Sequence, residues 1–511
     1  MSEDVKAEFG KIRSFLWPVH NYELKKLLPM FIIFFFISFN YTVLRDTKDT
    51  LIVTSSGAES IPFLKFWGVV PCAILFMLIY AKLSNVLSKE KLFYVTITPF
   101  LVFFGLFALV LYPYRDVLHP NESMDWLQAH LPQGMSGLVA CFRNWTYSLF
   151  YILSELWGSA VLSLMFWGFA NDIMRVTEAK RFYTLLGLGA NVALLFSGQA
   201  IAYFSDIRKY LPPDVDAWQI SLNYLMSMVV IAGIGVIATY WWMQRNVLTD
   251  KRYFDPENME KKTKKPKAKL SIMESFAYLA KSNYILCIAL LVIAYGICIN
   301  LVEVTWKGEL KKQYPNPNDY STFMGRFSQM TGFVTIIMMF IGGWIIRKKG
   351  WGFAAAITPT VLLLTGIGFF SFVIFSDSLQ HYITMLGTTP LFLAVMFGTA
   401  QNIMSKSSKY SLFDPTKEMS YIPLDQEAKV KGKAAIDVVG ARLGKSGGSL
   451  IQQILLVGFG SLAAITPYIA ICMIATIIVW LFAVKSLNKQ FVELTGEKAQ
   501  TGAQEAQPAK A

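Results

Sequence analysis

Residues 147–172 read YSLFYILSELWGSAVLSLMFWGFAND, and this stretch is the clearest guide to the class of protein. It exceeds the roughly 20 apolar residues that a helix needs to cross a bilayer, and Glu155 is its only charge before the final aspartate. A charge at the bilayer centre costs about 2.5–3.5 kcal/mol, so a carboxylate there normally faces a partner or a wet cavity. The stretch predicts a membrane helix with a paired or functional acid.

The composition of the whole chain also indicates a membrane protein. Of the 511 residues, 54% are hydrophobic and only 16% are charged, whereas about a quarter are charged in a typical soluble protein. The five cysteines and four histidines do not have the spacing of a metal motif, so we expect neither a metal nor a cofactor. The polar, acidic first residues argue against a signal peptide or a transit peptide.

Apolar runs separated by polar breaks predict twelve membrane spans. Most of the 47 lysines and arginines fall on the side of the N-terminus, and basic residues favour cytoplasmic loops. We therefore expect a multi-pass protein with both termini in the cytoplasm. The predicted spans are 27–44, 61–83, 92–112, 144–173, 182–205, 219–243, 282–305, 322–346, 352–375, 382–404, 433–458 and 462–485.

The spans divide the chain into five predicted parts. A cytoplasmic N-terminal segment (1–26) precedes a first half of six helices (27–243). A basic cytoplasmic linker (244–281) leads to a second half (282–485), and a polar cytoplasmic tail (486–511) follows. The linker run KKTKKPKAK suits topology and lipid headgroups. Because the net charge of +13 is distributed as the topology requires, we expect no nucleic-acid partner.

Four short matches recur in the same order in the two halves. FNYTVLRDTKDTL resembles INLVEVTWKGEL, which aligns Asn40 with Asn300, and PFLKFWG resembles TFMGRFS, which aligns Lys65 with Arg326. GFANDIM matches GTAQNIM, and EAK occurs in both halves. Such a repeat is typical of transporters that bind substrate between their halves. We predict an all-α polytopic protein of about 12 transmembrane helices in two six-helix halves, with a major-facilitator-like fold.

Several charged residues lie inside the predicted spans. Arg143, near a span start, is predicted to reach the membrane surface. The others allow two interpretations, an anion-binding cavity or internal ion pairs that hold the halves together. Their excess of positive charge favours a strongly anionic substrate such as a nucleoside triphosphate, with roughly four negative charges. These others are Lys65, Glu155, Glu303, Arg326, Arg442 and Lys445.

The stretch LGKSGG contains a lysine but does not match a phosphate-binding loop. That motif requires Gly-x4-Gly-Lys-Ser/Thr, and the upstream Gly440 is one residue too close. Lys445 instead falls within the eleventh predicted span, with Arg442 three residues earlier on the same helical face. Gly440, Gly444, Gly447 and Gly448 favour close packing against another helix. Lys445 is therefore predicted to meet a phosphate as a point charge.

Two further groups complete the predicted nucleotide site. The aromatic residues of the fourth span, Asn171 and, in the fifth span, Asn191 suit adenine recognition by stacking and amide hydrogen bonds. Lys65 and Arg326 are predicted to face one cavity and to close on the phosphates from two sides. Asn300, one turn before Glu303, is included in the predicted site.

Four stretches strongly resemble the ATP/ADP translocases of obligate intracellular bacteria, such as chlamydiae and rickettsiae, and of plastid envelopes. The resemblance runs from about residue 20 to residue 490 and is greatest to the chlamydial members. The stretches are LRDTKDTLIVTSSGAESIPFLKFWG, SELWGSAVLSLMFWGFAND, INLVEVTWKGELKKQYPNPNDYSTFMG and QNIMSKSSKYSLFDPTKEMSYIPLDQEAKVKGKAAIDVVGARLGKSGG.

The resemblance implies a non-enzymatic antiporter of a bacterial cytoplasmic (inner) membrane that imports ATP in exchange for ADP by alternating access. The charges on which transport depends in the family match Lys65, Glu155, Glu303 and Lys445 in this chain. Proton-coupled and broad-specificity nucleotide import remain alternatives within the family. A carrier of another phosphorylated anion is a further alternative, and the lack of a hydrolytic motif argues against a membrane enzyme. The expected partners are ATP, ADP and the lipid bilayer.

Overall fold

The structure is a computed structural model, and its regular structure is helical throughout the described part of the chain. Within that part, nine helices or helix runs are long and apolar enough to cross a membrane. The described residues are 19–250, 252–254, 282–425, 432–433, 436 and 440–505.

Three more crossings bring the number in the described chain to the twelve that the sequence predicts. The longest helix, α17 (Pro317–Ile374), is two crossings, because Gly350 adopts φ +81° and breaks it. Helices α19 (Pro390–Ser408) and α22 (Ala441–Phe459) each contain 19 residues, enough to span about 28 Å. The fold is thus all-α and polytopic, as predicted.

The first bundle contains six crossings, several of which are interrupted by π-helical segments. A helical cap, made of α7 (Arg115–Leu118), α8 (Asn121–His130), η4 (Gln133–Met135) and α9 (Ser136–Arg143), separates the third crossing from the fourth. The crossings are α3 (Leu24–Ser56), preceded by η1 (Asn21–Glu23); α4 (Ser60–Phe63), η2 (Leu64–Val69) and α5 (Val70–Val86); α6 (Lys89–Leu106) and η3 (Phe107–Leu111); α10 (Trp145–Trp157), η5 (Gly158–Phe166) and α11 (Trp167–Ile173); α12 (Val176–Ser205), followed by η6 (Asp206–Tyr210); and α13 (Ala217–Asn246).

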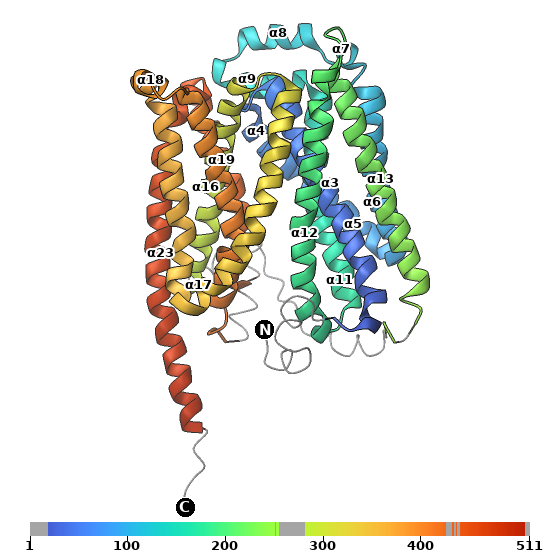
Figure 1. The fold of residues 1–511 in the computed structure, drawn as a ribbon, viewed down its shortest axis with the longest axis vertical. Coiled ribbons are helices and arrows are strands. Elements are labelled where there is room, and N and C mark those ends of the chain that lie inside the picture. The colour runs from blue at the N-terminus through green and yellow to red at the C-terminus, as the bar shows by residue number, and fades with distance from the viewer. Residues whose placement is uncertain are drawn as a thin grey trace, which may run out of the picture.

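The second bundle begins with α16 (Asn283–Gln313) and ends with α23 (Leu462–Glu505). Between them lie α17, α18 (Ser376–Thr384), α19, η7 (Lys409–Phe413), α20 (Asp414–Ser420) and α22. The two bundles stand side by side, and the start of the first described helix and the end of α23 lie at the same end of the molecule (Figure 1). We call this end the termini side and the other end the opposite side.

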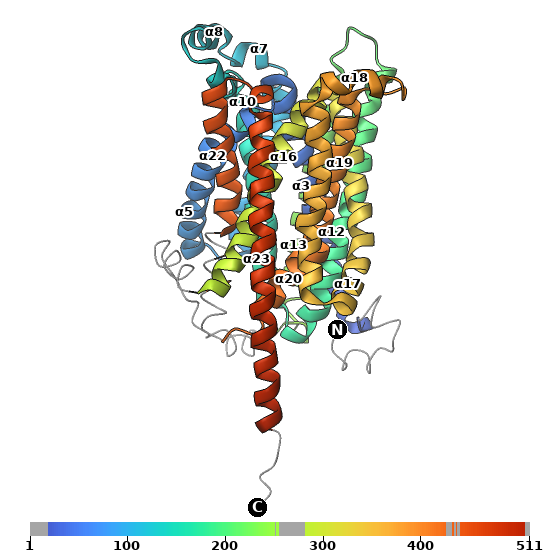
Figure 2. The ribbon, with the colours of Figure 1, turned by 90° about the vertical axis from the view of Figure 1, so that its left-hand side faces the viewer.

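Two helix pairs make prominent contacts between the bundles. Helix α12 lies along α17, where a Cβ on Gly198 would lie only 2.5 Å from the carbonyl oxygen of Gly325. Helix α22 lies beside α5 of the first bundle (Figure 2). The side-chain amide of Gln453 on α22 donates to the carbonyl oxygen of Pro62 at 2.9 Å and accepts from Trp67 Nε1 at 3.0 Å.

Several predicted span boundaries were wrong. The first span, 27–44, ends too early, because α3 continues through Arg45–Asp49 to Ser56. No glycine or proline occurs between residues 30 and 56, and the helix ends only at Gly57, which has φ +86°. Helix α16 similarly extends eight residues beyond the predicted end at 305.

Near the C-terminus the tenth and twelfth spans also differ from the prediction. The tenth crossing, predicted at 382–404, is α19, which begins at Pro390 after the separate short helix α18. The last helix, α23, continues past residue 485 to Glu505. The start of the eleventh predicted span lies outside the described residues, which resume at α22.

Candidate functional site

The extension of α3 places charged residues inside the helix bundle. Lys48 and Asp49 are both almost completely buried. The Lys48 ammonium lies 2.8 Å from Asp49 Oδ1 and 3.0 Å from Glu155 Oε1 on α10. It also lies 3.9 Å from the ring centroid of Tyr151. A desolvated lysine requires such partners, because an unpaired charge is costly in a low-dielectric interior.

These charges connect directly to the second bundle. Lys307 on α16 lies 2.8 Å from Asp49 Oδ2 and 3.2 Å from Glu303 Oε1, one helical turn away. Lys65, in η2, lies 3.5 Å from Glu303 Oε2 and donates to Asn300 Oδ1 at 2.6 Å. Six alternating charges thus link α10, α3, α16 and η2. We call this set the charge chain: Glu155, Lys48, Asp49, Lys307, Glu303 and Lys65.

Exposure divides the charge chain into two regions. Lys48, Asp49 and Lys307 have side chains only 2–3% exposed, and we call them the buried middle. The side chains of Glu155, Lys65 and Glu303 are 35%, 20% and 18% exposed. Water can therefore reach these three residues, unlike those of the buried middle.

Lys445 completes this reachable region. Its helix, α22, packs tightly on α16, because a Cβ on Gly444 would lie 3.0 Å from Gly296 Cα and one on Gly448 3.0 Å from Asn300 Cβ. Gly444 and Gly448 thus have the predicted packing role, whereas a Cβ on Gly447 would meet nothing within 4 Å and one on Gly440 would meet its nearest neighbours only at 3.6–3.9 Å. Lys445 is exposed, its charge acts on Glu155, and its ammonium has no partner among the described residues. We call Lys65, Glu155, Glu303 and Lys445 the accessible rim.

Two neighbouring groups add charge beside the rim. Lys406 on α19 lies 4.8 Å from the ring centroid of Phe327, and its ammonium has no ion-pair partner in the described part of the chain. Arg45 pairs with Asp46 at 3.0 Å, and both contact the hydroxyl of Ser328 on α17. The charge chain and the Arg45–Asp46 pair are each neutral, so Lys445 and Lys406 leave the region positive.

Comparison with known proteins shows the family of the chain. Residues 2–491 match the TLC ATP/ADP transporter family. The chain belongs to this family. It is 61% identical over 508 residues to "ADP,ATP carrier protein 1" of Chlamydia pneumoniae, with 99% of each chain covered. It is 54% identical to a chloroplastic ADP,ATP carrier protein of Arabidopsis thaliana, over 93% of this chain and 75% of the relative.

A solved structure supports the fold of this transporter. A bacterial homologue of the iron transporter ferroportin superposes with a TM-score of 0.55 at 12% identity, over 92% of this chain and 99% of that chain. At this identity the likeness concerns the fold alone. The transporter therefore has the predicted major-facilitator-like architecture of two six-helix halves.

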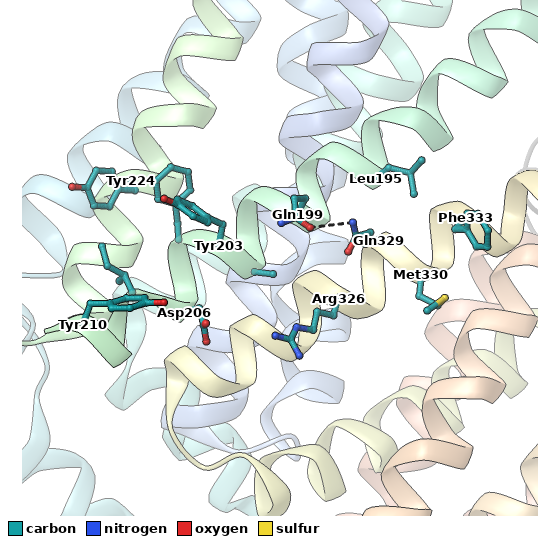
Figure 3. Close-up of a pocket in the computed structure, with 13 residues that line it drawn as sticks. Leu195, Gln199, Tyr203, Asp206, Tyr210, Tyr224, Arg326, Gln329, Met330 and Phe333 are labelled. Carbon is teal, nitrogen blue, oxygen red and sulfur yellow. Dashed lines mark hydrogen bonds between the residues drawn. The ribbon is translucent and has the colours of Figure 1, made fainter.

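The structure does not place Arg326 opposite Lys65, so the predicted two-sided clamp is wrong. Arg326 is exposed and lines a groove between α12, α13 and α17 (Figure 3). The inward face of α17 at this level instead carries Ser328, which contacts Asp46. Successive residues of a helix are turned by about 100°, so an alignment error of two residues moves a side chain to the other side.

The predicted adenine site is not assembled either. Asn171 lies near the end of α11 on the termini side, 16 residues from Glu155 or about 24 Å along the helix, and it accepts from the Tyr183 hydroxyl. Asn191 donates to its own helix at Gly187 and lies 3.7 Å from the sulfur of Met339 on α17.

The remaining predictions have mixed outcomes. Phe150, Trp157 and Phe166 of the fourth span are buried in the core, so these aromatic rings cannot stack on a dissolved base. Arg143 lies outside the crossings and pairs with Asp125 at 2.5 Å. The side chain of Arg442 lies outside the described residues.

Three residues of the charge chain were not predicted as site residues, because they fall in loops on the opposite side between the predicted spans: Lys48, Asp49 and Lys307. Lys406 also falls in a predicted loop. A usable signal was present: the charged stretch after residue 44 contains no helix breaker, and Lys307 follows Glu303 by one helical turn, which is the spacing of a helical ion pair.

Proposed function

We propose that this chain is an antiporter that imports ATP in exchange for ADP by alternating access of one site between its two halves. The observation that carries the proposal is the accessible rim, in which Lys445 and the Lys65–Glu303 pair come from three different helices and meet beside Glu155. Relatives named as ADP,ATP carriers support the choice of nucleotides. The protein moves the nucleotide without cleaving it.

The phosphates of the nucleotide bind Lys445 and Lys65, with Lys406 adding positive charge nearby. Lysine suits this role as a strongly hydrated point charge on a flexible stem. Lys445 has no described partner to displace, whereas Lys65 must exchange Glu303 for a phosphate oxygen. Glu155 and Glu303 compete with phosphate for these lysines, which limits affinity and allows release. Asn300, which accepts from Lys65, orients that ammonium.

Coupling of import to export follows from the ion pairs that cross the halves. In the empty protein Lys65–Glu303 and Asp49–Lys307 connect η2 and α3 of the first half to α16 of the second. These links oppose reorientation while the site is empty. A bound nucleotide takes Lys65 from Glu303 and weakens one link. Reorientation is therefore faster with cargo than without it, which is the requirement for exchange.

The protein resides in a bacterial cytoplasmic (inner) membrane with both termini cytoplasmic. The charge distribution supports this orientation more strongly than the sequence alone suggested. Arg45, Lys48 and Lys307 belong to the bundle interior, so the opposite side has fewer basic loop residues than predicted, and basic residues favour cytoplasmic loops. The proposed halves are 27–243 and 282–485, joined by the linker 244–281.

Uptake by proteoliposomes tests this function. Vesicles containing the full chain are loaded with ADP or left empty, and labelled ATP is added outside with and without a protonophore. Exchange requires rapid uptake into ADP-loaded vesicles, little into empty ones, and no effect of the protonophore. Collapse of uptake by the protonophore would establish proton coupling instead. Competition by a sugar phosphate as strong as that by ADP would indicate a carrier of other phosphorylated anions.

A further inference from the structure

A groove on the outer face of the bundle has no role in the exchange proposed above. It lies between α12, η6, α13 and α17 and has a volume of about 940 Å³ (Figure 3). We propose that this groove binds an anionic phospholipid. Arg326 holds the lipid phosphate, and an acyl chain lies along Leu195, Met330 and Phe333, all of which line the groove.

The face of α17 that carries Arg326 is the face toward lipid. Large apolar side chains recur along it about once per helical turn, and all of them are exposed. Because the chain spans a membrane, a helix face that exposes only large apolar groups faces acyl chains. Arg326 therefore projects into the bilayer region and away from the charge chain. The apolar residues of this face are Met330, Phe333, Ile337, Phe340, Ile341 and Trp344.

Arg326 is the unsatisfied charge of the groove. The guanidinium has no hydrogen bond or ion pair to any described residue, although it carries five donors. The neighbouring charges are already paired: Lys209 lies 2.8 Å from Asp206, and Arg208 lies 2.7 Å from Asp319. A charge within the membrane region is costly without a counter-charge, so the groove requires an anion.

The depth of Arg326 suits a lipid phosphate. It lies nine residues after Pro317, where α17 begins on the opposite side, or about 14 Å along the helix. Helical side chains point toward the N-terminus of their helix, which directs the guanidinium back toward the membrane surface. Tyr203, Tyr210 and Tyr224 line the same groove, and tyrosines concentrate at the level of the headgroups.

The remaining polar groups favour an anionic over a zwitterionic headgroup. Asp206 is the carboxylate that lines the groove, and its pairing with Lys209 leaves no free acid for a choline or an ethanolamine. Gln199 and Gln329 hydrogen-bond to each other at 3.1 Å, so they add polarity without net charge. One uncompensated arginine therefore faces the lipid, and it matches a phosphate with bidentate geometry.

Native mass spectrometry of the full chain in detergent provides the test, with phosphatidylglycerol and phosphatidylcholine of identical acyl chains as probes. We expect one saturable phosphatidylglycerol site, at least about tenfold tighter than for phosphatidylcholine. Arg326→Gln should reduce phosphatidylglycerol binding to the phosphatidylcholine level, and Arg326→Lys should retain most of it. Lys312→Gln is the matched control, because Lys312 is an exposed base near the same membrane surface that lies outside this groove.

Three results would overturn the proposal. The first is equal, unsaturable binding of both lipids by the wild type, which needs no variant. The second is a cross-linked dimer through a cysteine placed at Met330, which would make the groove a contact between two copies. The third is a loss of ATP affinity in Arg326→Gln as large as in Lys65→Gln, which would return Arg326 to the nucleotide site.

Discussion

The buried middle and the accessible rim belong to one network of ion pairs, yet they meet different physical requirements. Lys48, Asp49 and Lys307 are surrounded by protein, so each needs its partners merely to remain charged. The rim residues are reached by solvent, and Lys445 has no partner among the described residues. We infer that pairing and exposure, more than charge alone, distinguish the charges that hold the structure from those proposed to bind the nucleotide.

The largest effect is expected at the rim. Lys445→Ala should reduce ATP/ADP exchange by about a hundredfold, since a charge-assisted contact with phosphate is worth about 1.5–3 kcal/mol. Thermal stability should not fall, because no described partner is left unpaired. The measurement is uptake of labelled ATP into ADP-loaded vesicles beside a melting curve of the same preparation. Lys485→Ala, an exposed lysine on α23, serves as the control. Normal uptake by folded Lys445→Ala would remove this lysine from the site.

The second effect is expected in the buried middle, where a substitution should lower the stability of the protein. Asp49→Asn leaves Lys307 and Lys48 short of a counter-charge in a buried site. Loss of one partner of a buried pair typically costs ~3–5 kcal/mol, so the midpoint of unfolding should fall clearly. Chemical denaturation of wild type, Asp49→Asn and the double variant Asp49→Asn/Lys307→Gln measures this.

The double variant decides whether the pair itself is responsible. Removing both charges leaves no uncompensated ion at this contact, so it should recover much of the lost stability. Strict exchange should remain impaired, because the α3–α16 link that opposes reorientation of the empty protein is gone and uptake into vesicles without ADP should rise. If the double variant is as unstable as Asp49→Asn alone, the loss arises from changed packing, and the buried middle is not held by this pair.

The sequence predicted the number and type of the membrane helices, because hydropathy follows directly from the need to bury apolar side chains in lipid. Their ends were harder to predict. Charges such as Lys48 were assigned to a loop, although no glycine or proline interrupts α3 before Gly57. A helix can continue through charged residues where residues of other helices form ion pairs with them. Those partners are distant in sequence, so a local pattern does not reveal them.

The candidate site could likewise be predicted only in part, because hydropathy shows which charges lie in apolar runs but not which residues they contact. Lys65, Glu155, Glu303 and Lys445 attract attention because each lies within an apolar run. In the structure Lys65 pairs with Glu303, and the charges of Lys65 and Lys445 act on Glu155. The direction of a side chain around its helix is not visible in hydropathy. The position of Arg326 in the site was predicted from an alignment of weakly similar repeats. That alignment does not fix the direction of its side chain, and the prediction was wrong for this reason.

The third prediction tests whether the rim acids act on transport or on stability. Glu155→Gln and Glu303→Gln keep the side-chain shape and remove only the charge. Both carboxylates are partly solvated, so the free energy of unfolding should change by less than in Asp49→Asn. Exchange should fall by roughly tenfold, because neither glutamate then competes with phosphate for the lysines and the bound nucleotide is released more slowly. Melting and uptake are compared in one preparation. A stability loss at least as large as that of Asp49→Asn would mean that these acids are structural.

The smallest effect is expected at Arg326. This exposed base lies outside the charge chain, so it tests whether exposure alone makes a charge important for nucleotide binding. Arg326 lies on the lipid-facing side of α17, whereas Lys65 touches Glu303 and Asn300. In detergent without added lipid, Arg326→Ala should change ATP and ADP affinity less than about twofold, whereas Lys65→Ala should weaken both by about tenfold. Titration calorimetry with ATP, ADP and adenosine measures this. Adenosine, which lacks phosphates, should bind both variants equally weakly. If Arg326→Ala loses ATP affinity to the same extent as Lys65→Ala, exposure and pairing do not identify the substrate-binding charges, and the distinction between rim and surroundings fails.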